Sequence, residues 1–206
     1  MGRSNNVTPR KLPRQKRSMA TVDAIFEAAS QVFSENGYDI TTDKIAARAG
    51  VSIGTLYQYF PNKDAILFGL WRRHIVEAEA MVDSFMEDFL SNHEKDTRMI
   101  RILVDYMIAL HLENPGQHRL FSDEMPRPAS IIEHIKAFED KCSRFLESLI
   151  KSSDNIRLKN LPVSARIIYQ TLEGLVHHYI LYNSESMNQE EFAEELCDML
   201  NRYIFK

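Results

Sequence analysis

A close series of hydrogen-bonding side chains lies in the stretch SIGTLYQYFPNK, near the end of the first third of the chain. Leu56 and Phe60 are four residues apart and would pack inward on a helix, which leaves Thr55, Gln58 and Tyr59 facing outward. Hydroxyl and amide groups held together on a rigid helix can contact the edges of DNA bases or the phosphates beside them. Recognition of nucleic acid is therefore the chemistry that these residues favour.

Two short helices must position this surface. Thr41 or Thr42 could cap the first helix through its hydroxyl group, and the apolar residues around Ile45 fall on one face of it. Gly50 allows the left-handed backbone of a tight turn at little steric cost, and Ser52 would cap the second helix. This layout is a helix-turn-helix, in which the second helix enters the major groove.

The run KIAARAGVSIGTLYQYFPNKDAIL, residues 44–67, resembles the DNA-binding signature of the TetR/AcrR family of transcriptional regulators. A helix-Gly-helix pattern by itself also fits an ordinary helical hairpin, whereas AGVSxGTLYxYFxxK favours the family. The resemblance covers about the first third of the chain, and the remainder agrees only in helical character and length. It implies DNA-binding positions at Thr42, Ser52, Gly54, Thr55, Tyr57, Tyr59 and Lys63, to which we add Ile53 and Gln58 as expected base contacts.

These positions divide by the part of DNA that we expect them to contact. Base edges would be contacted by Ile53, Thr55 and Gln58, with Ile53 against a thymine methyl group. Phosphates would be held by Tyr57, Tyr59 and Lys63. Spacing leaves Ile53 and Tyr57 open, because each lies three or four residues from an inward position and could pack instead.

Charge is distributed unevenly along the 206 residues, whose net charge is −4. Residues 1–75 hold 11 Lys and Arg against 6 Asp and Glu, giving +5, and residues 76–206 hold 14 against 23, giving −9. A basic DNA-facing part attached to an acidic body fits this asymmetry. Residues 1–17 carry six basic residues, no acid and two prolines, and predict either a flexible arm on DNA or a solvated tail.

The predicted fold class is all-α, because Gly and Pro are scarce and the apolar residues recur at helical spacing. We expect a basic arm at 1–17, a helix-turn-helix domain at 18–63 and a helical ligand-binding and dimerisation domain at 64–206. Cys142 and Cys197 lack metal-ligand spacing and indicate reduced thiols. A cytoplasmic protein without a membrane span, metal or cofactor is expected.

Helical periodicity and breaks predict the elements in chain order. They are helices at 19–36, 41–49, 52–60, 63–90, 99–112, 117–125, 131–150, 162–182 and 188–205. The long helix at 63–90 would connect the DNA-binding part to the body, so it is the expected transmission element.

The last two helices carry more apolar residues than one inward stripe requires. The resemblance implies a homodimer, in which two helices from each subunit form a four-helix bundle, and a simple monomer core is the alternative. The expected interface residues are Leu172, Leu175, Tyr179, Phe192, Leu196, Met199 and Tyr203. Such a dimer would address a palindromic DNA operator.

Aromatic, sulfur-containing and histidine side chains on the central helices are the candidates for a small-molecule effector site. They are Trp71, His74, Met81, Phe85, Tyr106, Met107, Phe121, Phe138, Phe145, Tyr169 and His177. Each also fits an ordinary core or surface position. An apolar or amphipathic effector that releases a repressor from DNA is the expected function, with an activator as the alternative.

Two other classes of protein compete with this interpretation. A small helical enzyme is one, although the chain has no HExxH motif and no phosphate-binding glycine loop, and a turnover assay would test it. An architectural DNA binder is the other. It fits the basic arm but leaves the apolar C-terminal body unexplained, and DNA footprinting would distinguish it.

Overall fold

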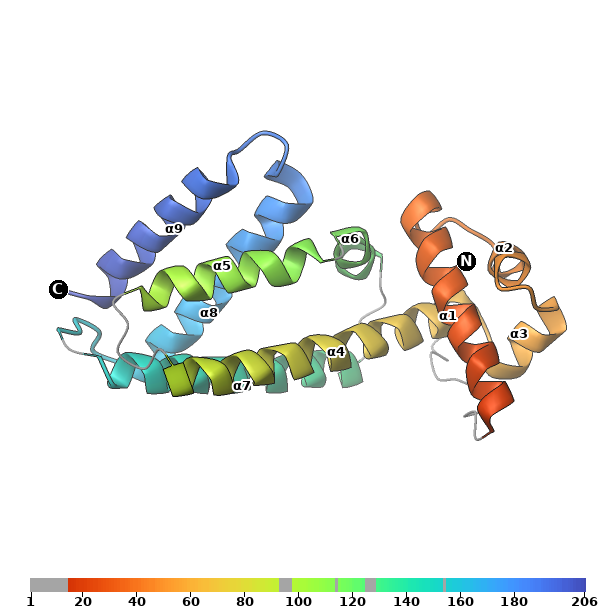
Figure 1. Cartoon of the computed structure of the whole chain (residues 1–206), viewed down its shortest axis with the longest axis horizontal. Coiled ribbons are helices and arrows are strands. Elements are labelled where there is room, and N and C mark those ends of the chain that lie inside the picture. The colour runs from red at the N-terminus through yellow and green to blue at the C-terminus, as the bar shows by residue number, and fades with distance from the viewer. Residues whose placement is uncertain (1–14, 93–97, 114, 125–128, 154) are drawn as a thin grey trace. The chain divides into compact units, whose positions relative to one another are not determined.

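A computed structural model describes residues 15–92, 98–113, 115–124, 129–153 and 155–206 (Figure 1). Within these ranges the chain is helical and forms no β-strand. The helices are α1 (Lys16–Asn36), α2 (Thr42–Arg48), α3 (Ile53–Tyr59), α4 (Lys63–Asn92), α5 (Met99–Leu112), α6 (Pro115–Asp123), α7 (Ala129–Lys151), α8 (Leu161–His178) and α9 (Gln189–Ile204). A π-helical turn, Tyr179–Asn183, extends α8. The all-α prediction is confirmed.

The first helix begins three residues earlier than predicted. The backbone N–H of Gln15 donates to Ser18 Oγ at 3.2 Å, and this contact satisfies an amide group at the start of α1. Lys16 and Arg17 are therefore helical and do not belong to the predicted arm. The rest of that arm, residues 1–14, lies outside the described residues. At its other end α1 stops as predicted, at Gly37 with φ +68°.

The chain divides into two compact units, and the division does not fall at the predicted boundary between residues 63 and 64. The first unit, which we call the head, contains the described residues up to Glu77 and α6 from Gly116 onward. Gln117 Nε2 donates to Ser30 Oγ of α1 at 2.7 Å, so α6 packs with the head. The first half of α4 does the same, because its residues 65–67 are fully buried.

Close packing of α1 on α4 explains why the head extends so far along α4. A Cβ atom at Gly69 would lie 2.6 Å from the ring of Phe26, so a larger residue there would require that ring to move. The Phe26 ring also meets Phe60 edge to face, with centroids 5.2 Å apart. The buried side of α1, which includes Ile25 and Phe33, follows the predicted helical spacing.

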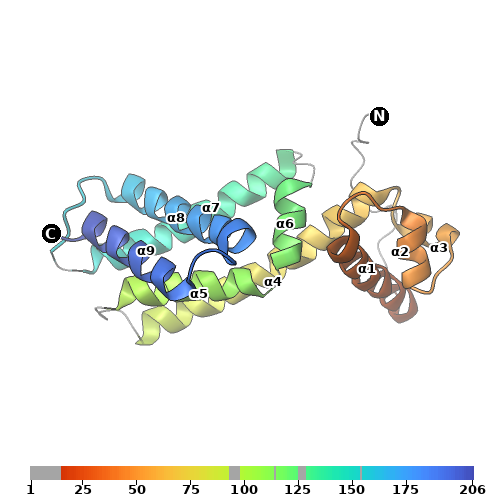
Figure 2. The same cartoon turned by 90° about the horizontal axis from the view of Figure 1, so that it is seen from above.

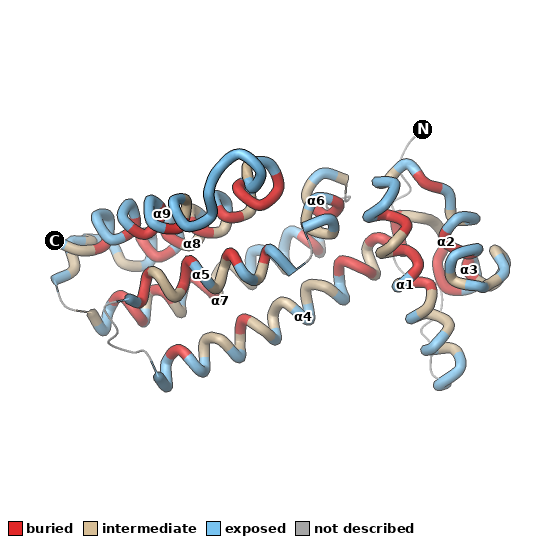
Figure 3. Tube along the Cα trace, turned by 45° about the horizontal axis from the view of Figure 1, so that its top comes forward, coloured by how far each residue is buried: buried red, intermediate tan, exposed pale blue. Residues whose placement is uncertain are grey.

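The second unit, which we call the body, contains α5, α7, α8, α9 and the second half of α4. Figures 1 and 2 show α5, α7, α8 and α9 side by side, and Figure 3 shows buried stretches alternating with exposed ones along α5 and α9. One buried apolar cluster joins these helices and includes Val104, Ile168, Val176 and Ile204. Burial of this cluster is the main stabilising contribution to the body.

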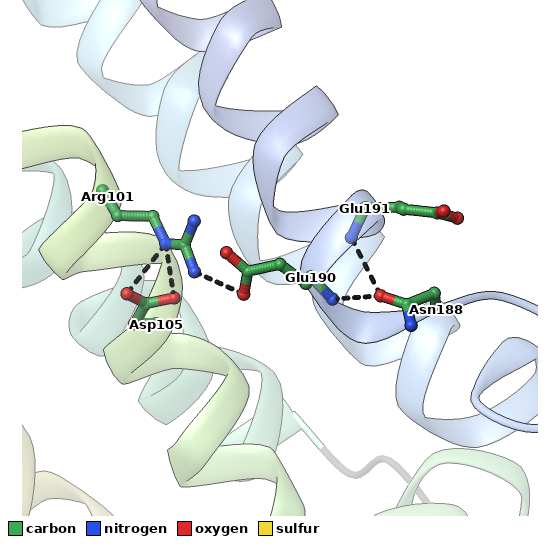
Figure 4. A network of polar contacts seen from close by, with 5 residues as sticks. All are labelled: Arg101, Asp105, Asn188, Glu190 and Glu191. Atoms are coloured by element: carbon green, nitrogen blue, oxygen red, sulfur yellow. Dashed lines mark hydrogen bonds and ion pairs between the residues drawn. The ribbon is translucent and has the colours of Figure 1, made fainter.

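Polar contacts add to the attachment of α9 to α5 (Figure 4). Arg101 Nε donates to both carboxylate oxygens of Asp105, at 2.8 and 2.9 Å, and its terminal nitrogen donates to Glu190 at 2.7 Å. Asn188 caps α9 by accepting from the backbone N–H groups of Glu190 and Glu191. The network places Glu190 where the cap and the ion pair meet, at the first turn of α9.

Candidate nucleic-acid interface

The turn between α2 and α3 has the predicted geometry. Gly50 has φ +67°, and the next N–H group, from Val51, donates to the Ala46 carbonyl at 3.0 Å. Ser52 caps α3 by accepting from the backbone N–H of Thr55 at 3.0 Å. A residue with a Cβ atom at position 50 would be strained by its backbone alone, because no atom lies within 4 Å of that site. The turn therefore holds the two helices at a defined angle.

The predicted hydroxyl cap of α2 is wrong. Thr41 occupies the N-cap position, yet its side chain makes no capping hydrogen bond. Thr42 instead shares a hydrogen bond with the Tyr57 hydroxyl, with the two oxygens 2.9 Å apart. Tyr57 is 39 % exposed, so it points outward, a question that the spacing of the sequence left open. This contact ties α2 to α3 on the outer surface of the helix-turn-helix.

The predicted DNA-binding residues of α3 differ in their exposure. Ser52, Gly54 and Gln58 are exposed, while Ile53 and Thr55 are half-buried. Gly54 and Gln58 lie on the side of α3 away from Leu56, which is fully buried. The surface offers hydroxyl and amide groups beside the backbone N–H groups at the start of a helix. Such groups can donate to phosphate and base acceptors alike.

Tyr59 does not face outward, so that prediction is wrong. Its side chain is only 8 % exposed, and it adds to the inward face formed by Leu56 and Phe60. A helix of seven residues completes fewer than two turns, and its buried side can therefore widen to include a position three residues from Leu56. The exposed tyrosine of α3 is Tyr57.

Lys63 makes contacts inside the head that the sequence did not predict. Its Nζ lies 3.7 Å from the centroid of the Tyr38 ring and donates to the carbonyl oxygens of Tyr38 and Ile40, the latter at 3.1 Å. The Tyr38 hydroxyl in turn donates to the buried carboxylate of Asp64. Lys63 thus fastens the connection between α1 and α2 to the start of α4, and its contact with phosphate remains a prediction.

Tyr38 and Asp64 are structural residues of the head that sequence reasoning missed in these roles. The pattern showed Asp64 only as a favourable charge in the first turn of α4, and Tyr38 carried no periodic signal. Tyr38 and Asp64 are 26 residues apart along the chain, so no helical spacing could have predicted their contact. Asn62, in contrast, was predicted as the cap of α4, and its side chain accepts from the N–H of Ala65 at 2.8 Å.

The candidate effector residues do not form one set, because they belong to both units. Trp71, His74 and Phe121 lie in the head, where the His74 ring is 5.5 Å from Phe121. The others lie in the body, where the Phe85 ring stacks on Tyr106 with centroids 3.8 Å apart. The remaining body candidates are half-buried on α4, α5, α7 and α8: Met81, Met107, Phe138, Phe145, Tyr169 and His177.

Polar groups accompany the aromatic rings inside the body. Two of these polar groups, Cys142 and Glu173, were not predicted as site candidates. Tyr169 and Cys142 lie close enough to affect each other, and burial raises the pKa of Cys142 to about 12 and also raises the pKa of Tyr169. Burial raises the pKa of Glu173 as well, while His177 opposes this shift. Glu173 could have been found from the four-residue spacing of Tyr169, Glu173 and His177 along α8.

The predicted dimer residues separate into buried and exposed groups. Leu172, Tyr179 and Leu196 are 3 to 4 % exposed and belong to the core of the body, so their assignment to an interface is wrong. Phe192 is half-buried and stacks on Tyr179 with centroids 4.3 Å apart. The exposed members are Leu175, Met199 and Tyr203. Other exposed apolar residues of α8 and its extension are Val163, Ile167 and Tyr182.

The described residues offer neither a metal site nor a membrane span. No three His, Cys, Asp or Glu side chains of the described ranges come together as a metal site. No helix within those ranges has both the length and the apolar character needed to cross a membrane.

Comparison with known proteins agrees with this geometry in both units. Residues 25–70 match the family described as bacterial regulatory proteins, tetR family, and residues 96–204 match the tetracyclin repressor-like C-terminal domain. The second match alone covers more than half of the chain. TetR regulators bind DNA operators and small-molecule effectors and act as dimers.

Individual relatives are distant but match over most of their length. The nucleoid occlusion factor SlmA of Shewanella amazonensis is 24 % identical over 87 % of this chain and 93 % of its own. The fatty acid metabolism regulator protein of Bacillus subtilis is 25 % identical over 85 % and 91 %. The crystal structure of NalD from Pseudomonas aeruginosa, the secondary repressor of the MexAB-OprM multidrug efflux pump, superposes with a TM-score of 0.69 at 17 % identity, covering 93 % and 99 %. The chain therefore belongs to the TetR family, and it is a DNA-binding transcriptional regulator rather than an enzyme.

Proposed function

We propose that this protein is a repressor that binds a palindromic operator as a homodimer in the cytoplasm and leaves it when an amphipathic small molecule enters the body. The single observation that carries the proposal is the rigid polar surface of α3, which the Ser52 cap and the Gly50 turn hold in place. Family membership supports the remaining parts of the proposal.

For operator recognition, Gln58 is the side chain best placed to read a base. It is exposed on α3, and an amide group can make two hydrogen bonds to adenine in the major groove. Selection of duplexes from a random library by the full-length protein tests this assignment and the symmetry of the operator. A palindrome with half-sites about one helical turn apart supports the proposal, and enrichment of no sequence contradicts it.

For dimerisation, the exposed apolar residues of α8 and α9 supply the surface. On α8 and its extension, Val163, Ile167, Leu175 and Tyr182 are between 42 and 54 % exposed. Their spacings of four, eight and seven residues keep them near one side of the helix. A second copy of the chain would bury them together with the exposed residues of α9. Sedimentation of the wild-type protein at micromolar concentration tests this, and a stable monomer would contradict it.

For effector release, α4 is the element that joins the two functions. It is one continuous helix of 30 residues, with its first half in the head and its second half in the body. A molecule that binds beside Phe85 would contact the same helix whose start is fastened to the head through Lys63. The coupling is reciprocal, so operator DNA should weaken effector binding by the same factor.

The experiment that tests release is a thermal-shift screen of apolar and amphipathic compounds, followed by operator titration with and without each stabilising compound. A coupling of about 5- to 150-fold in operator affinity is expected. If every stabilising compound leaves that affinity unchanged, release by an effector is contradicted and DNA recognition still stands.

A further inference from the structure

Gly174, in the last third of α8, is a helical glycine that no packing contact of its own subunit explains. Its φ is not in the positive range, so its backbone would accept any residue. A Cβ atom at this position would have no described atom within 4 Å, whereas at Gly69 it would lie 2.6 Å from the Phe26 ring. Glycine in a helix interior lowers stability relative to alanine. Gly174 therefore carries this cost without a contact in the described part of the chain that requires it.

The surface around Gly174 is a strip of α8 that carries no Asp, Glu, Lys or Arg. Its members are spaced by three or four residues and so share one side of the helix. We name them the uncharged strip: Val163, Ile167, Thr171, Gly174 and His178. Thr171 is half-buried and the others are exposed. The His178 ring lies 5.0 Å from the ring of Tyr182, so the π-helical turn extends the strip to a length of about five turns.

The exposed side of α9 differs from the uncharged strip in its charge. From Gln189 to Ile204 the helix holds five acidic residues and one basic residue, and all six are exposed. Two copies of the chain that met through α9 would bring these like charges together, which disfavours such a contact. The Tyr203 hydroxyl donates to Ser164 Oγ at 3.3 Å, so the end of α9 lies beside the start of α8. Charge therefore favours α8 at the centre of a contact between two copies, with the end of α9 at its edge.

We propose that the α8 helices of two subunits cross at Gly174, where the missing side chain lets the two backbones approach closely. TetR regulators act as dimers, so the partner is a second copy of this chain. The axes of packed helices lie about 8–10 Å apart, and the side chains at the contact set that distance. In a symmetric dimer the same patch serves both subunits, so Gly174 lies beside the two-fold axis and faces its own copy.

This arrangement gives the exposed apolar residues of α8 a common partner. Val163 and Ile167 precede the crossing and Tyr182 follows it, and the second subunit covers all three. The inference rests on the proposed homodimer. It adds which helix lies at the centre of the dimer and at which residue the two helices meet.

Sedimentation of full-length Gly174→Leu tests the crossing. Leucine favours a helix more than glycine does, so circular dichroism should show a folded chain. Its side chain would hold the two backbones apart, and we expect the dissociation constant of the dimer to rise about 10- to 100-fold, as for other over-packed contacts. The matched control is Ala137→Leu, at an exposed position of α7, which should leave that constant unchanged. A folded Gly174→Leu protein that dimerises like the wild type, or an equal rise in both variants, would overturn the proposal.

A cysteine at the same position locates the two-fold axis with a smaller change. Two cysteines can form a disulfide when their Cβ atoms are about 3.5–4.5 Å apart. Oxidised glutathione should therefore link two Gly174→Cys subunits and should not link Met199→Cys subunits, which carry the thiol on α9. The native Cys142 and Cys197 are buried, so the wild-type protein is the control. Linked Met199→Cys subunits, or a dimeric Gly174→Cys protein that stays unlinked, would overturn the crossing.

The oligomeric state of the wild-type protein separates this inference from the proposed function. If the wild type is a dimer, Leu175→Glu is a monomer and Gly174→Leu remains a dimer, the proposed homodimer stands and the crossing at Gly174 fails. If the wild type is a stable monomer, the proposed homodimer fails and this inference fails with it.

Discussion

The head and the body carry out their tasks with different kinds of surface. In the head, short helices are fixed by specific polar contacts, such as the Ser52 cap and the Lys63 bonds to two carbonyl oxygens. In the body, long helices are held by a broad apolar cluster, and few polar groups lie inside it. A reading surface for DNA must be rigid to be selective, whereas a site for an amphipathic molecule needs apolar area and a small number of placed polar groups.

The largest expected effect comes from comparing a buried with an exposed leucine in the body. Leu196→Glu places a charge in the core at a residue that is 4 % exposed, and we expect a chain that does not fold. Leu175→Glu changes a residue that is 42 % exposed, so we expect a folded monomer that no longer binds the operator specifically. Circular dichroism and sedimentation distinguish the two. A folded Leu196→Glu protein, or a dimeric Leu175→Glu protein, would contradict this division of α8 and α9.

The buried and exposed leucines of α8 and α9 show what could be predicted about the body. The helix bounds were close, with 99–112 matching α5, because apolar spacing and proline breaks mark them clearly. The buried and the exposed apolar faces of α8 and α9 were not distinguished, because each of these helices carries apolar residues on both faces. Spacing finds the stripes of a helix but does not tell which stripe meets its own subunit. Leu172 and Leu196 were therefore assigned to the wrong surface.

In the head, local chemistry was predictable and long-range contacts were not. The Gly50 turn and the Ser52 cap depend on neighbouring residues only, and the structure has both. The Lys63 contacts reach back about 25 residues to Tyr38, which no short motif encodes. Tyr59 was misplaced because α3 is too short for its periodicity to define the width of its buried side.

A substitution at Lys63 tests whether this residue acts mainly inside the head. Lys63→Ala removes two hydrogen bonds from a charged donor, and we expect it to lower the free energy of unfolding of the head by about 2 kcal/mol. Urea denaturation measures this, with the exposed residue changed in Lys44→Ala as the control. The slope of operator affinity against salt should change by less than about 1. Unchanged stability with a slope lower by about 1 would instead identify Lys63 as primarily a phosphate contact.

A smaller and more local effect is expected for Gln58. Gln58→Ala should cost about 1–2 kcal/mol in operator binding and relax the preference at one base pair of each half-site, because the amide no longer reads that base. Stability should not change, since the side chain is exposed. Competition between operators that differ at single positions measures the change. A uniform loss of affinity for all sequences would show that Gln58 contacts the backbone of DNA instead.

The smallest effect should come from the ion pairs of Arg101, although they are the most extensive polar network joining α5 to α9. Arg101→Gln should lower the Tm by no more than about 2 °C, because its partners Asp105 and Glu190 are more than half exposed and solvent weakens such pairs. The hydrogen bond from Arg101 lowers the pKa of Glu190, so its contribution is present above the usual pKa of a glutamate and is lost as the pH falls through the lowered one. Thermal melts of both proteins at neutral and acidic pH should therefore converge on acidification. A large decrease in Tm at neutral pH would mean that polar contacts stabilise the body as they stabilise the head, which would contradict the difference between the two units.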